Sequence, residues 1–140
     1  MDSLVAVFLA WIFAQTGLTA DAPPVMLAPK SELEKLYYGP AANHSSFNLI
    51  ALYHHPTGTV YLPDTWSAAE LPDRSVLLHE LVHHVQRVNN VRGNCRAALE
   101  RQAIELQIAW LRSQGVEDPY ELIGSDAFTV RILTSCPEEE

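Results

Sequence analysis

The sequence predicts a single α+β domain, in which a β-hairpin forms a small sheet that packs on two long helices. The chain has 140 residues, a length that suits one domain. Residues 47–62 hold two short runs of strand-forming residues around a turn, and residues 72–113 carry apolar side chains at helical spacing. This order, a strand pair followed by two helices, is the basis of the prediction.

Residues 1–20 differ from the rest of the chain and resemble a secretory signal peptide. The uncharged apolar run LVAVFLAWIFA spans positions 4–14, and a small-residue ending of the A-x-A kind follows it. The run is shorter than the roughly 20 residues of a membrane span, so we expect cleavage after Ala20 or Ala22. An uncleaved membrane anchor is the alternative, because no Lys or Arg precedes the run. The sequence therefore predicts a signal peptide at 1–20 and one domain at 21–140.

Cys95 and Cys136 are the only cysteines of the sequence, and in an exported protein an even number favours a disulfide. Two free buried thiols are the alternative if the chain remains in the cytosol. Ligation of zinc by thiolates is disfavoured, because the sequence has no C-x-x-C spacing. We therefore expect a Cys95–Cys136 disulfide in a secreted domain, located in the periplasm or the extracellular space.

The acidic character of the chain limits its partners. Its formal net charge is −8, and removal of residues 1–20 would change it to −7, because Asp2 is the only charged residue there. An acidic domain is a poor candidate for binding nucleic acid or an anionic membrane surface. We expect no nucleic-acid partner, and membrane contact only if the N-terminal segment stays uncleaved.

The first predicted elements precede the long helices. Residues 21–30 contain three prolines and little periodicity, and we expect an N-terminal arm there. The S-x-x-E pattern at 31–34 is a capping box and predicts a short helix over 31–38. Strand formers at 47–54 and 59–62, separated by turn residues, predict the hairpin.

Two helices and an ambiguous tail follow. The first helix is predicted from Pro72 to about Asn89, with Asp73 as its N-cap, and its apolar residues cover most of its surface. The second is predicted over about 95–113. The tail at 118–134 begins like a helix but also contains a run that favours an extended strand.

The first long helix contains the motif H-E-x-x-H, formed by His79, Glu80 and His83. Residues four apart share a helix face, so the two imidazoles can converge on one metal ion. Zinc accepts such nitrogen ligands, and a carboxylate beside it can take a proton from a bound water molecule. We expect His79 and His83 to be metal ligands and Glu80 to be the catalytic base.

A catalytic zinc has three protein ligands, so a third must come from elsewhere. The H-x-x-G-x-x-H extension of the metzincins is absent, because Gln86 and Asn89 stand in place of its glycine and last histidine. The second helix offers Glu100 and Glu105, which lie about 140° apart around the helix axis. Glu100 shares a face with apolar residues, whereas Glu105 can pair with Arg101 on a solvated face. Glu100 is the predicted third ligand.

The motif followed by Glu-Arg-Gln-Ala at 100–103 resembles the gluzincin metallopeptidases, including their small members, the minigluzincins. It also resembles small exported metallopeptidase families that are uncharacterised. The resemblance covers about residues 47–111. It implies a zincin-like fold, one Zn²⁺ per chain on His79, His83 and Glu100, and a peptide or protein substrate held by strand addition at the hairpin edge. Ile104 departs from the pattern, because many gluzincins have there an acidic residue that orients a histidine ligand.

We therefore predict a small secreted zinc metallopeptidase that hydrolyses peptide bonds with a zinc-activated water, Glu80 being the general base. The side chains of a suitable type to stabilise the oxyanion are Tyr53, His54, His55, Tyr61 and Tyr120. One alternative is a non-catalytic zinc-binding or regulatory exported protein on the same scaffold, although such a protein would not need Glu80. The other is a structural exported domain held together by its disulfide.

Overall fold

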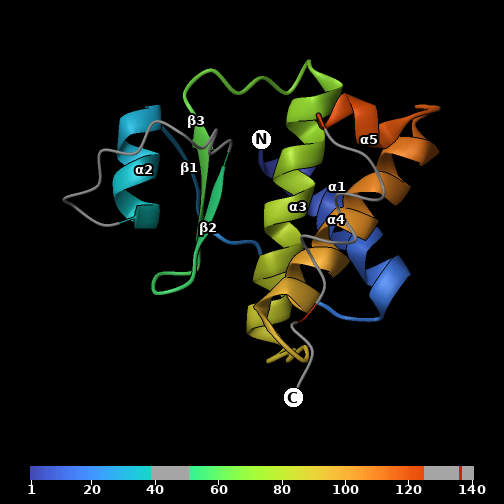
Figure 1. Ribbon diagram of the computed structural model, residues 1–140, viewed down its shortest axis with the longest axis horizontal. Helices are drawn as coiled ribbons and strands as arrows, with labels where there is room; N and C mark the ends of the chain where they lie inside the picture. The colour runs from blue at the N-terminus through green and yellow to red at the C-terminus, as the bar shows by residue number, and fades with distance from the viewer. Residues whose placement is uncertain (39–50, 125–135, 137–140) are drawn as a thin grey trace.

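The structure of the protein is a computed structural model that describes residues 1–38, 51–124 and 136. In these residues, five helices and a three-stranded mixed sheet form an α+β domain, with the sheet packed against the helices α3 and α4 (Figure 1). This arrangement confirms the predicted fold class. The elements are α1 (Asp2–Thr16), β1 (Val25–Ala28), α2 (Lys30–Tyr38), β2 (Leu52–His54), β3 (Thr59–Pro63), α3 (Leu71–Val88), α4 (Arg96–Ser113) and α5 (Pro119–Leu122).

The predicted hairpin is present as β2 and β3, which pair in antiparallel fashion with Tyr53 opposite Val60. Gly58, in the turn between them, has a φ of 66°, which glycine adopts without strain. Residues 47–50 of the predicted first strand lie outside the described residues. In the part of the chain that the structure describes, β2 pairs with β3 alone and therefore forms one edge of the sheet.

Strand β1 corrects the expectation of an arm without secondary structure at 21–30. It pairs in parallel with β3, and Val25 lies opposite Val60. The strand has only four residues, and the groups that satisfy its backbone lie far along the sequence. No local pattern of apolar residues could therefore have predicted it.

Two predicted helix starts need correction. Helix α3 follows Glu70 as its N-cap, and Asp73 lies inside the first turn. The Asp73 carboxylate instead accepts a hydrogen bond from the backbone N–H of Ser67, at 2.9 Å. Helix α2 begins at Lys30, one residue earlier than predicted, so Ser31 is not at the N-cap position of a capping box. Both helices are otherwise present where the sequence predicts them.

The second long helix and the tail agree with the sequence-based prediction as far as they are described. Cys95 is the N-cap of α4, and a disulfide joins it to Cys136. Such a bond is typical of proteins in oxidising compartments outside the cytoplasm. Residues 118–134 begin with the short helix α5, whose N-cap Asp118 accepts a hydrogen bond from the backbone of Glu121. The later part of this segment, from residue 125, lies outside the described residues.

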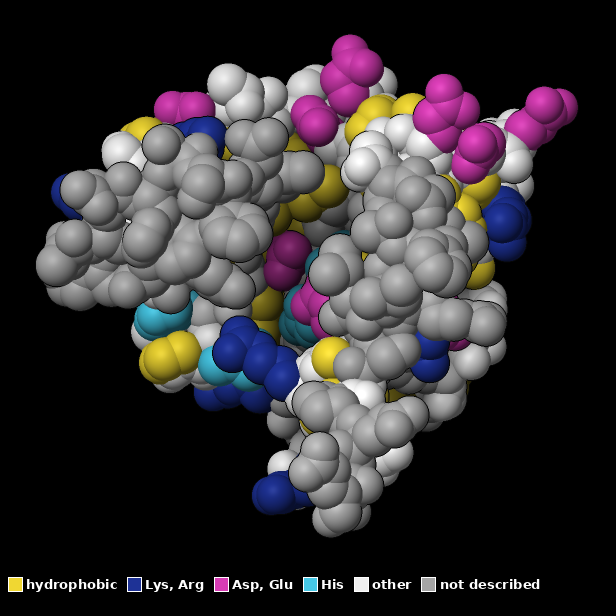
Figure 2. Space-filling view, viewed as in Figure 1, with side chains coloured by type: hydrophobic (Ala, Val, Ile, Leu, Met, Phe, Trp, Pro, Cys, Tyr) yellow, Lys and Arg dark blue, Asp and Glu magenta, His cyan; other side chains and the backbone are white. Residues whose placement is uncertain are grey.

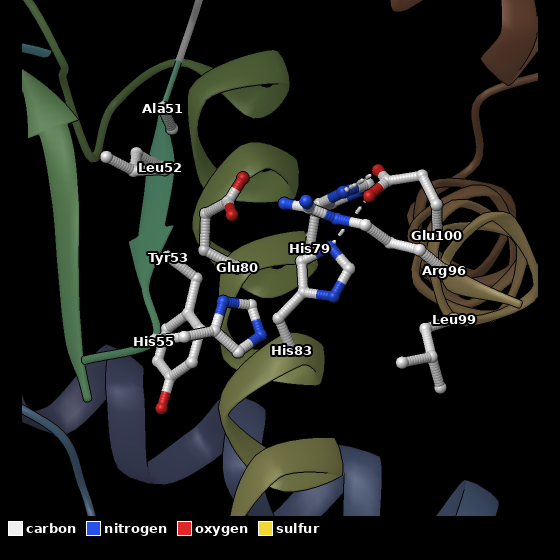
Figure 3. A pocket seen from close by; sticks show the side chains of 10 residues that line it. All are labelled: Ala51, Leu52, Tyr53, His55, His79, Glu80, His83, Arg96, Leu99 and Glu100. Atoms are coloured by element: carbon white, nitrogen blue, oxygen red, sulfur yellow. Dashed lines mark ion pairs between the residues drawn. The ribbon is translucent and has the colours of Figure 1, made fainter. Parts of the chain in front are cut away.

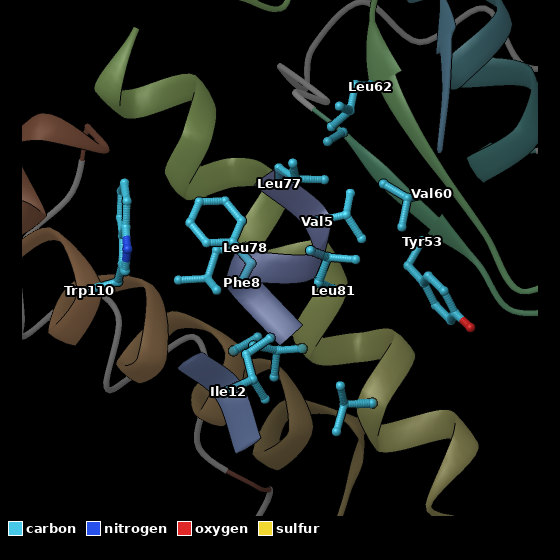
Figure 4. Close-up of a cluster of buried hydrophobic side chains, with 14 of the residues drawn as sticks. Val5, Phe8, Ile12, Tyr53, Val60, Leu62, Leu77, Leu78, Leu81 and Trp110 are labelled. Carbon is cyan, nitrogen blue, oxygen red and sulfur yellow. The ribbon is translucent and has the colours of Figure 1, made fainter. Parts of the chain in front are cut away.

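Helix α1, formed by the predicted signal segment, packs into the hydrophobic core against α3 and α4 (Figure 4). Its side chains Val5, Phe8 and Ile12 are buried. The rings of Phe8 and Trp110 meet edge to face, with their centroids 5.1 Å apart. Among the described helices, none combines the length and apolar character that a membrane span requires. Cleavage after Ala20 or Ala22 stays a prediction.

Candidate metal centre

Helices α3 and α4 bring three candidate ligands together (Figure 3). His79 and His83 lie one turn apart on the face of α3 that is turned toward α4, and Glu100 reaches them from α4. The carboxylate oxygens of Glu100 lie 2.6 Å from Nε2 of His79 and 3.0 Å from Nε2 of His83. The close approach of the helices is helped by Ala103, a small and fully buried residue of α4.

The structure brings Glu100, and not Glu105, to the two histidines. Glu105 is exposed and pairs with Arg101 of the same helix, with 3.8 Å between Arg101 Nε and a carboxylate oxygen of Glu105. This pairing is the solvated-face arrangement that the sequence indicates. The angular separation of the two glutamates on α4 therefore predicts correctly which of them faces α3.

Two glutamines hold the histidine rings on the side away from Glu100, and the sequence analysis gave neither of them this role. The Nδ1 atoms of His79 and His83 lie 2.9 Å from the side-chain oxygens of Gln107 and Gln86, respectively. Each ring thereby donates its Nδ1 proton to an amide oxygen and presents Nε2 to Glu100. Gln107 is buried and its amide nitrogen donates to Ser75. Its position two turns after Glu100, on the same face of α4, is the sequence signal that could have identified it.

The donor set fits a divalent metal ion. The ligand atoms of His79, His83 and Glu100 all lie within 4.8 Å of one another. Two imidazole nitrogens and one carboxylate oxygen form a ligand set that zinc uses in catalytic sites, with a fourth position for water. Around a tetrahedral ion with bonds of about 2.0–2.2 Å, ligand atoms lie roughly 3.5 Å apart. The described contacts would thus have to lengthen by less than about 1 Å.

The protonation of this cluster follows from its burial and its hydrogen bonds. Burial disfavours the charged form of His79, but the hydrogen bond to Glu100 and the charges of Glu80 and Glu100 outweigh it and raise its pKa to about 9. Burial acts on Glu100 in the opposite sense. There the hydrogen bonds from His79 and His83 prevail and hold the pKa of the carboxyl well below its usual range. His79 thus carries the proton on Nε2 and donates it to the Glu100 carboxylate, at the place where a metal ion would bind.

Glu80 lies beside the three candidate ligands without joining them. Its side chain is turned toward the strand β2 rather than toward Glu100 (Figure 3). Only 8% of the residue is exposed. Burial raises the pKa of its carboxyl, and the positive charges of His79 and His83 partly offset that effect. A buried carboxyl group beside the candidate ligands is suited to accept a proton and to return it.

Two pockets meet at His79 and Glu80. One, of about 280 Å³, lies between β2 and α4 and is lined by polar and charged side chains together with apolar ones. The other, of about 340 Å³, is mostly apolar and includes Val76, Ile104 and Ile123. In the space-filling view, acidic and histidine side chains lie at the bottom of a hollow (Figure 2). An elongated ligand that passes Glu80 could therefore occupy both pockets at once.

The structure distinguishes among the five side chains whose chemical type is suited to stabilise an oxyanion. Tyr53 and His55 line the pocket that contains Glu80. The hydroxyl of Tyr53, however, is engaged with Nδ1 of the buried His84, at 2.8 Å. The remaining three, His54, Tyr61 and Tyr120, line neither of the two pockets that meet at Glu80. Among the five, His55 is thus the one whose polar group faces the site.

The fold and the site define an α+β domain with a His-His-Glu cluster, placed between two helices, that could hold a metal ion. The chain belongs to the DUF6647 family, a domain of unknown function that matches residues 1–138. The match therefore includes the N-terminal segment as well as the His-His-Glu cluster. No curated protein and no solved structure matches the chain.

Proposed function

We propose that the protein is an exported zinc-dependent metallopeptidase of the gluzincin type, which hydrolyses peptide bonds. The observation that carries the proposal is the convergence of His79, His83 and Glu100, with the buried Glu80 directly beside them. A protein that only stores or senses zinc needs the first three residues but has no use for a buried base. The Cys95–Cys136 disulfide supports action in an oxidising compartment.

Each residue of the site has a defined task in this proposal. His79, His83 and Glu100 would hold one Zn²⁺, which would supply Lewis-acid chemistry toward the scissile carbonyl and the attacking water. Glu80 accepts a proton from the attacking water and delivers it to the leaving amine. His55 donates a hydrogen bond to the oxygen on which negative charge develops.

The edge strand β2 supports a peptide as the substrate. Leu52 and Tyr53 of this strand line the pocket beside Glu80. An extended peptide can add to a free strand edge through backbone hydrogen bonds, which hold it without regard to most of its side chains. Such a peptide would pass between β2 and the metal cluster, with a peptide bond close to Glu80.

The proposal is tested by the metal content and the peptide cleavage of the wild type, Glu80→Gln and His83→Ala. We expect about one zinc per wild-type chain and cleavage of a mixed peptide library. Glu80→Gln is expected to retain zinc but to lose at least about 100-fold in kcat, since its amide cannot accept the proton. His83→Ala is expected to lose both zinc and cleavage. Zinc in every variant except His83→Ala, with cleavage in none, would instead support a non-catalytic zinc protein.

A further inference from the structure

We infer that Arg96 forms a subsite for a carboxylate of the substrate, next to the scissile bond. The inference rests on the proposed peptidase function and specifies its substrate class: peptides that carry an anionic group within one or two residues of the bond that is cut. The carboxylate can be the C-terminus of a short peptide or the side chain of Asp or Glu.

The position of Arg96 is the first support. It is the first residue of α4 and lies one helical turn before Glu100, so both side chains leave the same face of the helix. Its side chain extends from α4 into the pocket that contains Glu80 (Figure 3). It also lines an adjoining cavity of about 640 Å³, which continues along β2 past His54 and Pro56. Arg96 thus lies where a bound peptide would extend beyond the His-His-Glu cluster.

The charge of Arg96 is the second support. The ion pairs of the described residues are His79–Glu100, His83–Glu100 and Arg101–Glu105, and none of them engages Arg96. His55 lines the same two pockets as Arg96. In Figure 2, Lys or Arg and His side chains gather along one side of the hollow. A positive rim on a chain of net charge −8 is suited to receive a negative group.

The chemistry of the guanidinium group specifies the ligand group, and the distance from Arg96 to the site specifies where that group lies in the peptide. A planar guanidinium binds a carboxylate with two parallel hydrogen bonds, which gives both strength and orientation. Residues one helical turn apart have Cβ atoms separated by roughly 5–6 Å, and an extended peptide advances about 3.4 Å per residue. A carboxylate on Arg96 therefore belongs one or two residues away from the bond beside Glu80. The mostly apolar pocket on the other side of Glu80 would take an apolar side chain.

The test compares peptides that differ in one charge. All carry an apolar residue before the scissile bond. In the first pair, the peptide ends one or two residues after the scissile bond, one member in a free carboxylate and the other in a carboxamide. In the second pair, both members have an amidated C-terminus, and one carries Asp and the other Asn one or two residues after the scissile bond. We expect kcat/KM to be about 10- to 100-fold higher for the charged member of at least one pair, mainly through KM. The pair that shows the preference identifies the source of the carboxylate.

Substitutions of two arginines show whether Arg96 causes the preference for charged peptides. Arg96→Gln is expected to reduce the ratio between charged and neutral peptides to near one. Arg92→Gln is the matched control, because Arg92 is exposed and belongs to none of the pockets at the site. Equal losses on charged and neutral peptides in Arg96→Gln would overturn the inference, since they would indicate an effect on the oxyanion or on folding. A wild type without preference would overturn it as well.

A binding measurement separates this inference from the proposed function. The zinc-loaded Glu80→Gln variant and the same variant with Arg96→Gln are titrated with fluorescent versions of the four peptides. We expect the second change to weaken binding of the charged peptides by about 10- to 100-fold more than that of the neutral ones. This result would stand even if no peptide were cleaved, in which case only the peptidase proposal would fail. Equal affinities for charged and neutral peptides in both variants would overturn the inference.

Discussion

At the scale of single residues, the histidine pair is distinguished by what holds its rings. In both cases the partner at Nδ1 is a neutral amide oxygen, from Gln107 or Gln86. An amide fixes the tautomer and the ring orientation as a carboxylate does, but it adds no negative charge to the imidazole. These glutamines perform the orienting task that the apolar Ile104 cannot. The histidines are therefore pre-oriented, with less basic rings than a carboxylate partner would give.

The role of Gln107 can be tested through zinc affinity. Gln107→Leu removes the acceptor for the Nδ1 proton of His79 and is expected to weaken zinc binding by about 10- to 100-fold. Gln107→Glu keeps an acceptor and is expected to retain or increase the affinity. Competition with a chromogenic chelator measures both. Gln114→Leu, at the exposed end of α4, is the control, and a similar loss in this variant would contradict the assignment.

Residue patterns predicted part of the candidate site because helix geometry is local. The four-residue spacing of His79 and His83 and the angle between Glu100 and Glu105 depend only on 100° per residue. The capping role of Asp73 was predicted wrongly, because the same carboxylate can bind a loop N–H as well as the helix terminus. The spacing places Gln107 on the face of α4 that carries Glu100, but which histidine it contacts depends on how the two helices pack.

At the scale of elements, α4 carries Glu100, Gln107 and Arg96 and is anchored at its N-terminus by a covalent bond. Its N-cap, Cys95, is joined to Cys136 across 41 residues. The bond thus holds the end of α4 from which the side chain of Arg96 extends into the pocket. Strand β1 illustrates the limit of prediction at this scale, because its partner β3 lies more than 30 positions away.

The contribution of the disulfide can be measured with the double variant Cys95→Ser/Cys136→Ser. Serine is itself a favourable N-cap residue, so the start of α4 should not be weakened by the change. Loss of a cross-link that closes 41 residues is expected to lower the free energy of unfolding by about 4 kcal/mol in the loop-entropy model. Urea denaturation with and without a reducing agent measures it. A wild type that is equally stable when reduced would argue against this estimate.

At the scale of the whole molecule, α3 is the central helix, on which two other helices and the sheet pack. Helices α1 and α4 and the strands β2 and β3 all contact it (Figure 1). The sequence indicated a helix buried on most sides, and this prediction is confirmed. It did not indicate that residues 1–20 supply one of the packing partners, because an apolar run of this length is equally typical of a signal peptide.

The packing of α1 gives the N-terminal segment two possible roles, as a cleaved signal peptide and as a helix of the hydrophobic core. As a signal peptide, the segment would be removed after Ala20 or Ala22, in the stretch without helix or strand before β1. As a core helix, it covers apolar side chains of α3 and α4 that would otherwise face water. His84 of α3 and Asn89, the C-cap of that helix, also bind the backbone oxygens of Asp21 and Thr19, respectively. Whether α1 stabilises the folded chain therefore decides between these two roles of the segment.

A matched pair of substitutions in the full-length chain measures that property. Phe8 is 1% exposed, whereas Phe13 on the same helix is 49% exposed. If α1 is part of the core, Phe8→Ala leaves a cavity beside Trp110 and is expected to lower the free energy of unfolding by about 3–5 kcal/mol. Phe13→Ala, on the solvent side, is expected to change it by less than about 1 kcal/mol. Urea denaturation followed by Trp fluorescence checks both, and equally small effects would show that the domain is stable without α1, as a cleaved signal peptide requires.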